Sequence, residues 1–134
     1  MKSDSLRVSA VIPAEPQAVY DAWLSNKEHG AMTDTPPAKI SARAGGAFTA
    51  GGGYMWGKTL ELDPPRKIVQ SWRTTDFPKD APDSRLELLL EGAKGGTKII
   101  IVQTEIPSGQ GADYRQGWID YYFEPMKRYF AAKG

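Results

Sequence analysis

The sequence predicts an α+β fold in which a curved antiparallel sheet of about seven strands packs against one long carboxy-terminal helix. Three observations support this fold class. Residues 38–105 read as a succession of strands separated by turns rich in Gly and Pro. A strand and two short helices precede them, and short loops without a βαβ pattern favour antiparallel pairing. Residues 112–132 have the apolar period of an amphipathic helix.

The amino-terminal part is expected to hold one strand and two short helices. Residues 6–12 alternate between apolar and polar side chains, a period of two that is typical of a half-buried strand. Pro16 suits the first turn of a helix, so residues 16–24 are expected to form one. Residues 25–28 have the spacing of a capping box and begin a second, brief helix, which the prolines at 36–37 must end.

Six further strands are expected in the middle of the chain. Apolar, aromatic and β-branched residues recur there in short runs, and clusters of Gly or Pro separate the runs. The double glycine before the last run has the chemistry of a hairpin turn. The expected strands are residues 39–44, 47–50, 54–62, 67–74, 86–91 and 98–105.

The carboxy-terminal segment, residues 112–132, contains one proline and no turn cluster, which predicts a single long helix. At about 1.5 Å per residue it would extend about 30 Å, enough to cross a whole sheet. Its aromatic and aliphatic side chains fall on one arc and its charged side chains on the other. Pro125 removes a backbone donor, so we expect a bend near residues 121–125. Because large aromatic side chains hold the helix away from the strands, we also expect a cavity between helix and sheet.

The composition excludes several classes of function. A chain of 134 residues has the length of one domain, so we expect a single domain over residues 1–134. A net charge of +1 gives no basic excess that would bind nucleic acid or an anionic membrane. Without cysteine, and with one histidine, we expect no metal site and no cofactor. The amino terminus has no long apolar run, so we expect no signal peptide, no membrane span and a cytoplasmic location.

Two stretches of the chain resemble a known family. Residues 116–127 read QGWIDYYFEPMK, close to the pattern QGWxxYYFExxK of the family's closing helix. Residues 63–73 read DPPRKIVQSWR, which is similar to the family's strand–turn–strand ending in Trp-Arg. The family is that of the homologues of the activator of heat-shock-protein-90 ATPase, and the resemblance covers about residues 7–130. It implies the helix-grip fold of the START-like superfamily, whose members commonly hold an apolar ligand between the long helix and the sheet.

The resemblance also implies a protein partner. The eukaryotic co-chaperone carries such a domain at its carboxy terminus, behind a separate amino-terminal domain that makes major contacts with the chaperone. Here the first expected strand begins within ten residues of Met1. We therefore treat contact with a chaperone as an alternative to ligand binding.

Three features could indicate a chemical role but are better explained as ordinary parts of the fold or its surface. Residues 52–59 match the phosphate-binding pattern G-x-x-x-x-G-K-[ST], but the alternation that begins at Lys58 predicts a strand where that loop needs a helix. His29, the only histidine, falls in a short polar helix and is expected on the surface. The carboxylates on the strands are expected to point to solvent; they are Glu61, Glu87, Glu91 and Glu105.

The cavity is expected to be lined by large apolar side chains and one cation. Arg115 projects about 60° from Trp118, inside the apolar arc of the helix. It either extends to solvent or lies at the cavity mouth, where it would favour ligands with an anionic head. Arg73 is a weaker candidate of the same kind. We expect Trp72 and Trp118 to belong mainly to the core. The candidate cavity residues are Trp56, Trp72, Leu88, Ile101, Arg115, Trp118, Tyr122 and Met126.

Three functions are compatible with these features. The first is a non-catalytic domain that binds an apolar or amphipathic small molecule in the cavity. The second is a protein-interaction module, such as a partner of a heat-shock-protein-90 type chaperone, which an exposed apolar patch would favour. The third is an enzyme of the cyclase or hydrolase kind, which would need two or more ionisable groups in the cavity. The sequence determines neither the ligand nor the oligomeric state.

Overall fold

The computed structural model describes residues 2–133. All seven expected strands and both expected short helices are present. The strands are β1 (Ser3–Ile12), β2 (Lys39–Ile40), β3 (Ala47–Ala50), β4 (Met55–Asp63), β5 (Lys67–Thr74), β6 (Ser84–Ala93) and β7 (Gly96–Pro107). The helical segments are α1 (Pro16–Leu24), α2 (Asn26–Met32), the 3₁₀ turn η1 (Gly51–Gly53), α3 (Gly111–Gly117), the π-helical segment η2 (Trp118–Phe123) and α4 (Glu124–Lys133).

The seven strands form one sheet in the order β1-β7-β6-β5-β4-β3-β2, and every pairing is antiparallel. The predicted α+β class with an antiparallel sheet is therefore confirmed. The first strand crosses the molecule to pair with the last, from Ser3 opposite Pro107 to Ile12 opposite Thr97. This pairing places the first strand at one edge of the sheet, beside the last strand.

The expected strand over residues 39–44 is wrong after its first two residues, because β2 ends at Ile40. The backbone turns there instead of extending. The N–H of Ser41 donates to the carbonyl of Ala47 at 3.0 Å, and the N–H of Gly46 donates to the carbonyl of Arg43 at 3.0 Å. These bonds close a tight loop before β3 begins.

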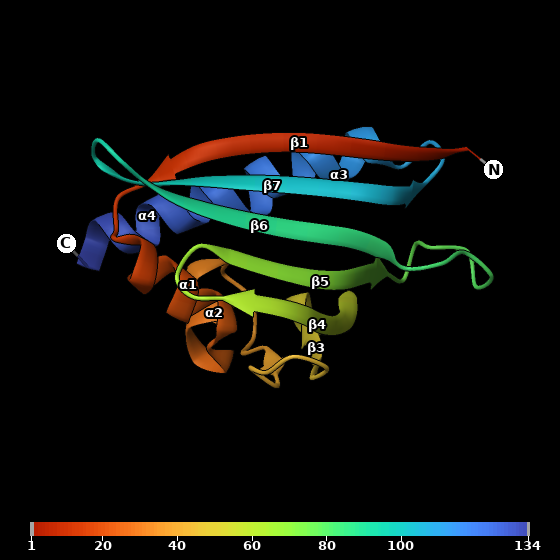
Figure 1. The fold of residues 1–134 in the computed structure, drawn as a ribbon, viewed down its shortest axis with the longest axis horizontal. Helices are drawn as coiled ribbons and strands as arrows, with labels where there is room; N and C mark the ends of the chain where they lie inside the picture. Colours follow the sequence, from red (N-terminus) through yellow and green to blue (C-terminus); the bar gives the residue numbers. More distant parts are fainter. Residues whose placement is uncertain (1, 134) are drawn as a thin grey trace.

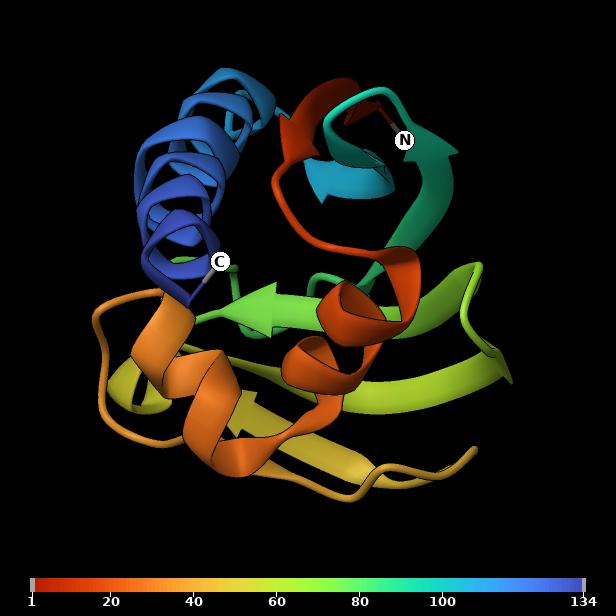
Figure 2. The ribbon, with the colours of Figure 1, turned by 90° about the vertical axis from the view of Figure 1, so that its left-hand side faces the viewer.

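The sheet curls around the carboxy-terminal helical segments. Figure 1 shows α3 and α4 behind β1, β7 and β6. Figure 2, turned by 90°, shows the sheet bending from β1 to β3 with the helical segments on its open side, while α1 and α2 lie at one end. The concave face of the sheet and these helical segments enclose the core, which includes the fully buried Ile12, Ile99 and Met126.

The carboxy-terminal segment is not the uniform α-helix that the sequence predicts. It passes through one π-helical stretch, η2, between α3 and α4. The N–H of Glu124 donates to the carbonyl of Ile119, five residues earlier. Pro125 follows directly and has no N–H. The α-helical pattern, in which each N–H donates to the carbonyl four residues earlier, is therefore interrupted there. The irregularity lies where the proline predicts a bend, and it takes the form of a wide turn. Within residues 2–133, no helix has the length and hydropathy that crossing a membrane requires.

Candidate functional site

A groove of about 500 Å³ lies between the concave face of the sheet and the segment formed by α3 and η2. We call it the aromatic groove. Its helical wall is one stripe of side chains spaced three and four residues apart, which is the spacing of a single helix face. The residues that line it are Tyr54, Met55, Trp72, Asp76, Gln110, Asp113, Tyr114, Gly117, Trp118, Tyr121 and Tyr122.

The floor of the aromatic groove consists of buried aromatic rings. Trp118 lies at the centre, with its ring centroid 5.4 Å from that of Trp72 and 4.8 Å from that of Tyr122. The ring of Tyr114 meets Trp72 edge to face at 5.1 Å. Trp72 and Trp118 are each only 3% exposed, so these rings belong to the core and present a small part of their surface to the groove.

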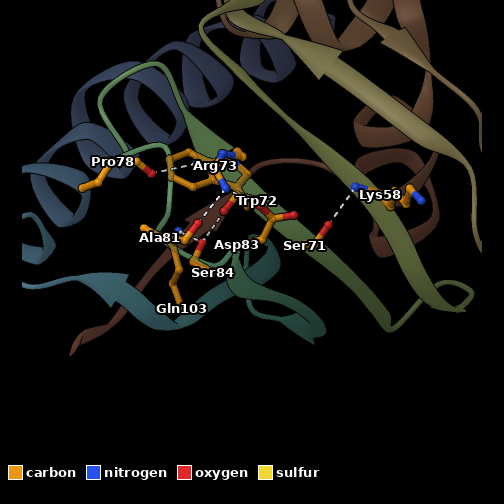
Figure 3. A network of polar contacts seen from close by, with 9 residues as sticks. All are labelled: Lys58, Ser71, Trp72, Arg73, Pro78, Ala81, Asp83, Ser84 and Gln103. Atoms are coloured by element: carbon orange, nitrogen blue, oxygen red, sulfur yellow. Dashed lines mark hydrogen bonds and ion pairs between the residues drawn. The ribbon is translucent and has the colours of Figure 1, made fainter. Parts of the chain in front are cut away.

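A buried chain of hydrogen bonds fixes the position of the Trp118 ring. The indole N–H of Trp118 donates to Oε1 of Gln103 at 2.9 Å. The amide of Gln103 donates to Oγ of Ser84 at 2.9 Å, and Ser84 donates to the carbonyl of Trp72 at 2.6 Å. Figure 3 shows the part of this chain that crosses the sheet, from Gln103 to Trp72. The side chains of Trp118, Gln103 and Ser84 are therefore all hydrogen-bonded, and the helix is tied to three strands.

One wall of the aromatic groove is a closed ring of hydrogen bonds. The hydroxyl of Tyr114 donates to Oε1 of Gln110 at 2.7 Å, and the Gln110 amide donates to the carbonyl of Asp76 at 3.0 Å. The N–H of Asp76 donates to Oγ1 of Thr74 at 3.1 Å. Thr74 lies 2.7 Å from the Tyr114 oxygen and completes the ring as donor, since the Tyr114 proton is already used. Tyr54 donates to the Asp76 carboxylate at 2.7 Å.

At the other end of the groove, Tyr122 is held by a buried histidine. Nδ1 of His29 lies 2.7 Å from the carbonyl of Trp23, which can only accept, so this nitrogen carries the proton. Nε2 then accepts from the hydroxyl of Tyr122 at 2.7 Å. Burial lowers the pKa of His29, which keeps the imidazole neutral in this arrangement. The expectation that His29 lies on the surface is wrong: it is 4% exposed, because α2 packs its imidazole against the rings of Trp23 and Tyr122.

The phenols of Tyr54, Tyr114 and Tyr122 keep their protons at neutral pH, because their pKa values are raised. Burial raises the pKa of Tyr122. Burial also raises the pKa of Tyr54, with a further contribution from its hydrogen bond to Asp76. The pKa of Tyr114 is raised by burial and, more weakly, by the negative charges of Asp76 and Asp113. These hydroxyls therefore act as neutral hydrogen-bonding groups rather than as bases.

The structure brings together only some of the residues that the sequence suggests for the cavity. Trp72, Trp118 and Tyr122 line the aromatic groove. Since Met55 faces the groove, strand alternation places its neighbour Trp56 on the opposite, convex face, where it is 37% exposed. The remaining apolar candidates lie in the filled core instead, with almost no exposed surface; they are Leu88, Ile101 and Met126.

Of the two positions considered for Arg115, extension to solvent or a place at the cavity mouth, the structure has the exposed one. Arg115 is exposed and lines a separate hollow beside the start of β1, together with Asp4 and Leu6. The groove runs along the helix stripe that contains Tyr114. One further residue rotates a side chain by about 100° around a helix axis, so Arg115 faces β1 instead. Its charge is therefore not available to a ligand in the groove.

The other features with a chemical interpretation lie outside the groove. Arg73 donates to the carboxylate of Asp83 and to the carbonyl of Ala81, both at 2.9 Å, and to the carbonyl of Pro78 at 3.0 Å (Figure 3). It fixes the loop between β5 and β6. Lys58 lies in β4, so the phosphate-loop pattern continues into a strand, as predicted. The strand carboxylates reach solvent: Glu61, Glu91 and Glu105 are exposed, and Glu87 is half-buried.

Several groove residues were missed by reasoning from the sequence. Gln110, Asp113, Tyr114 and Tyr121 share the helix stripe with Trp118, so their spacing alone indicates a common face. No local signal identifies Tyr54 or Asp76. Tyr54 precedes β4 and Asp76 follows β5, and only the antiparallel pairing of these two strands brings both residues to the groove. His29 also has no local signal, since its partner Tyr122 is 93 residues away.

Comparison with known proteins identifies related chains. A family model described as "Activator of Hsp90 ATPase homolog 1-like protein" matches residues 13–131. The human protein "Activator of 90 kDa heat shock protein ATPase homolog 1" is 30% identical over 115 residues, which cover 86% of this chain and 33% of the human one. An uncharacterized protein of Schizosaccharomyces pombe is 28% identical over 96% of this chain and 41% of its own length. The chain thus spans between a third and two fifths of these two relatives.

Solved structures share the fold. An "HSP90 activator" from Plasmodium falciparum superposes with a TM-score of 0.84 at 18% identity, over 95% of this chain and 96% of that one. A Chromobacterium violaceum protein gives a TM-score of 0.74 at 25% identity, over 94% and 96% of the two chains. Together with the curled sheet and the long carboxy-terminal helical segment, these likenesses confirm the expected helix-grip fold.

Proposed function

Since the chain belongs to the family of activator of Hsp90 ATPase homologue 1-like proteins, we propose that it is a non-catalytic helix-grip domain that binds a small amphipathic molecule in the aromatic groove. One observation carries this proposal. The groove has a volume of about 500 Å³ and an aromatic floor, and hydrogen-bonding groups lie along one wall. Ligand sites commonly have volumes of about 300–1,000 Å³ and combine apolar walls with a few placed polar groups.

The groove is preformed rather than dependent on a rearrangement. The chain of hydrogen bonds from Trp118 through Gln103 holds its floor, and the ring of bonds around Tyr114 holds its wall. A rigid site loses little conformational entropy when a ligand binds, which favours affinity. The polar groups of Tyr114 and Gln110 on the wall already have internal partners, so a ligand would be recognised by ring contacts and by charge.

Titration with the neutral fluorescent probe N-phenyl-1-naphthylamine tests this proposal. We expect a saturable rise in probe emission, and replacement of Gly117 provides the matched pair of variants. Gly117 lines the groove, and a Cβ there meets only the Tyr121 ring at 3.7 Å. Gly117→Ala should retain binding, whereas the larger side chain of Gly117→Leu should fill the groove and abolish it. Absence of binding to the folded wild-type protein would overturn the proposal.

A second candidate function is contact with a chaperone of the Hsp90 type. The observation that favours it is the 30% identity to the human protein named as an activator of that chaperone's ATPase. The convex face of β4 exposes Trp56 and Leu60, which are 37% and 48% exposed, and would supply an apolar contact surface. The ATPase rate of a purified Hsp90-type chaperone, measured with and without this chain, tests the idea. Stimulation that is lost in Trp56→Ala but retained in Gly117→Leu would support this function independently of the groove.

A further inference from the structure

The charged residues of the aromatic groove are all of one sign. Two of its lining residues are acidic, Asp76 and Asp113, and none of its described lining residues is Lys or Arg. Within residues 2–133 neither carboxylate takes part in an ion pair. The Asp76 carboxylate accepts one hydrogen bond, from the neutral hydroxyl of Tyr54. Among the residues that the structure describes, neither negative charge therefore has a cation within ion-pair distance.

The rings of the groove have the same preference for positive charge. The face of an aromatic ring carries negative electrostatic potential and attracts a cation placed over it. Six of the lining residues are Tyr or Trp, and two of these rings are substantially exposed: Tyr54 is 38% exposed and Tyr121 is 71% exposed. A positive group between these rings and the two carboxylates would gain from both sources. An anionic group would be repelled by both.

We propose that the ligand of the aromatic groove is a small organic cation, a protonated amine or quaternary ammonium joined to an apolar or aromatic body. This inference rests on the proposed function and names its substrate class. The apolar body lies against Trp72 and Trp118 on the floor, and the cationic head lies at the rim near Asp76 and Asp113. This assignment reverses the preference for anionic heads expected from Arg115, since Arg115 lines a different hollow.

The test compares three probes that differ in the charge of the head group. Benzyltrimethylammonium carries a positive charge, neopentylbenzene is its neutral isostere, and benzylsulfonate is the anion. Binding to the full chain is measured by calorimetry at low salt, with tryptophan emission as a second readout. We expect the cation to bind at least about tenfold more tightly than the neutral isostere, as a partly shielded cation–π contact assisted by a carboxylate implies. The anion should bind most weakly.

Substitution of the two carboxylates tests whether the preference for the cationic probe arises in the aromatic groove. Asp113→Asn combined with Asp76→Asn keeps the acceptor for Tyr54 and removes both charges, and it should remove most of the difference between cation and isostere. Asp120→Asn is the matched control: Asp120 is exposed in the same helical segment but does not line the groove. It should leave the preference unchanged. All of these positions are exposed, so the variants are expected to fold.

The outcomes separate this inference from the proposed function. Equal binding of cation and isostere, or a preference for the anion, would overturn the inference and leave the groove as a general ligand site. A cation preference that survives removal of both carboxylates would overturn the assignment to Asp76 and Asp113. If no probe binds, or if Gly117→Leu leaves binding unchanged, the groove is not the binding site and the proposed function fails as well.

Discussion

Nε2 of His29 lies 2.7 Å from the hydroxyl oxygen of Tyr122, and 93 positions of sequence separate the two residues. This hydrogen bond joins α2 to η2 in the buried core. In the neutral imidazole Nδ1 donates to the carbonyl of Trp23, and the lone pair on Nε2 accepts from the tyrosine hydroxyl. A second proton on His29 would make Nε2 a donor and place a positive charge in the buried core, and the Tyr122 proton would have to turn to Sδ of Met55, a weak acceptor at 3.6 Å.

The stability of the protein should therefore fall in mild acid. The pKa of His29 is lowered in the folded state from its ordinary value of 6.5 by burial, so the unfolded chain binds more protons. Stability from this group is complete above pH 6.5 and is lost as the pH falls toward the folded pKa. The slope reaches at most about 1.4 kcal/mol per pH unit. Urea unfolding at a series of pH values between 7.5 and 5 measures it.

The variant His29→Asn provides the comparison for this pH dependence. Because His29 is the only histidine, the variant has no imidazole to titrate. It should be less stable than the wild type at pH 7.5, since Tyr122 loses its acceptor. Its slope between pH 7 and 6 should nevertheless be shallower. An identical slope in both proteins would contradict the assignment of the acid sensitivity to His29.

Replacement of Trp118 by alanine should destabilise the fold strongly. Trp118 is 3% exposed, packs between Trp72 and Tyr122, and supplies the donor to Gln103. Truncation of a buried tryptophan costs about 3–5 kcal/mol. Trp118→Phe keeps most of the packing but leaves the Gln103 acceptor unpaired, which costs about 1–3 kcal/mol. Chemical unfolding measures both, and a loss below about 1 kcal/mol for Trp118→Ala would show that the helix does not depend on this ring.

Two glycine-to-alanine changes should alter the stability of the fold in opposite directions. Gly117 has helical dihedral angles, and a Cβ there would make only an ordinary contact with the Tyr121 ring at 3.7 Å, so Gly117→Ala should raise stability by up to about 1 kcal/mol. Gly57 lies in β4 where a Cβ would overlap the carbonyl oxygen of Ser71 on β5. Gly57→Ala should therefore force the strands apart and cost about 1–3 kcal/mol. Thermal unfolding of the two variants side by side checks the prediction. It would be contradicted if both changes shifted the melting temperature in the same direction.

The phosphate-loop pattern around Lys58 should bind no nucleotide. Residues 55–63 form a strand, so the backbone N–H groups of a helix end do not converge on this loop. We expect calorimetry with ATP and magnesium to give no heat beyond dilution, for the wild type and for Lys58→Ala alike. Micromolar ATP binding by the wild type that disappears in Lys58→Ala would contradict this reading of the sequence.

Much of the architecture could be predicted because its signals are local. The alternation in residues 6–12, the start of α1 at Pro16 and the irregularity ahead of Pro125 all depend on a few neighbouring residues. Only one of the two hydrogen bonds of the predicted capping box is present in the structure. Ser25 accepts from the N–H of Glu28 at 3.2 Å, but the Glu28 carboxylate accepts from Tyr129 on α4 rather than turning back to the cap. A distant partner replaced the local one.

The sequence by itself determined the fold class, the family and the aromatic face of the closing helix, since periodicity and short motifs encode these within the chain. Only the tertiary structure decided which flank of that face stays open. Met126 fills the core while Tyr121 remains 71% exposed, and the π-helical turn and the curl of the sheet set which flank is covered. The same packing turned Arg115 away from the groove and brought Asp76 into it. The charge of a site depends on such long-range placement, because a side chain acts on a ligand through distance and not through its position in the sequence.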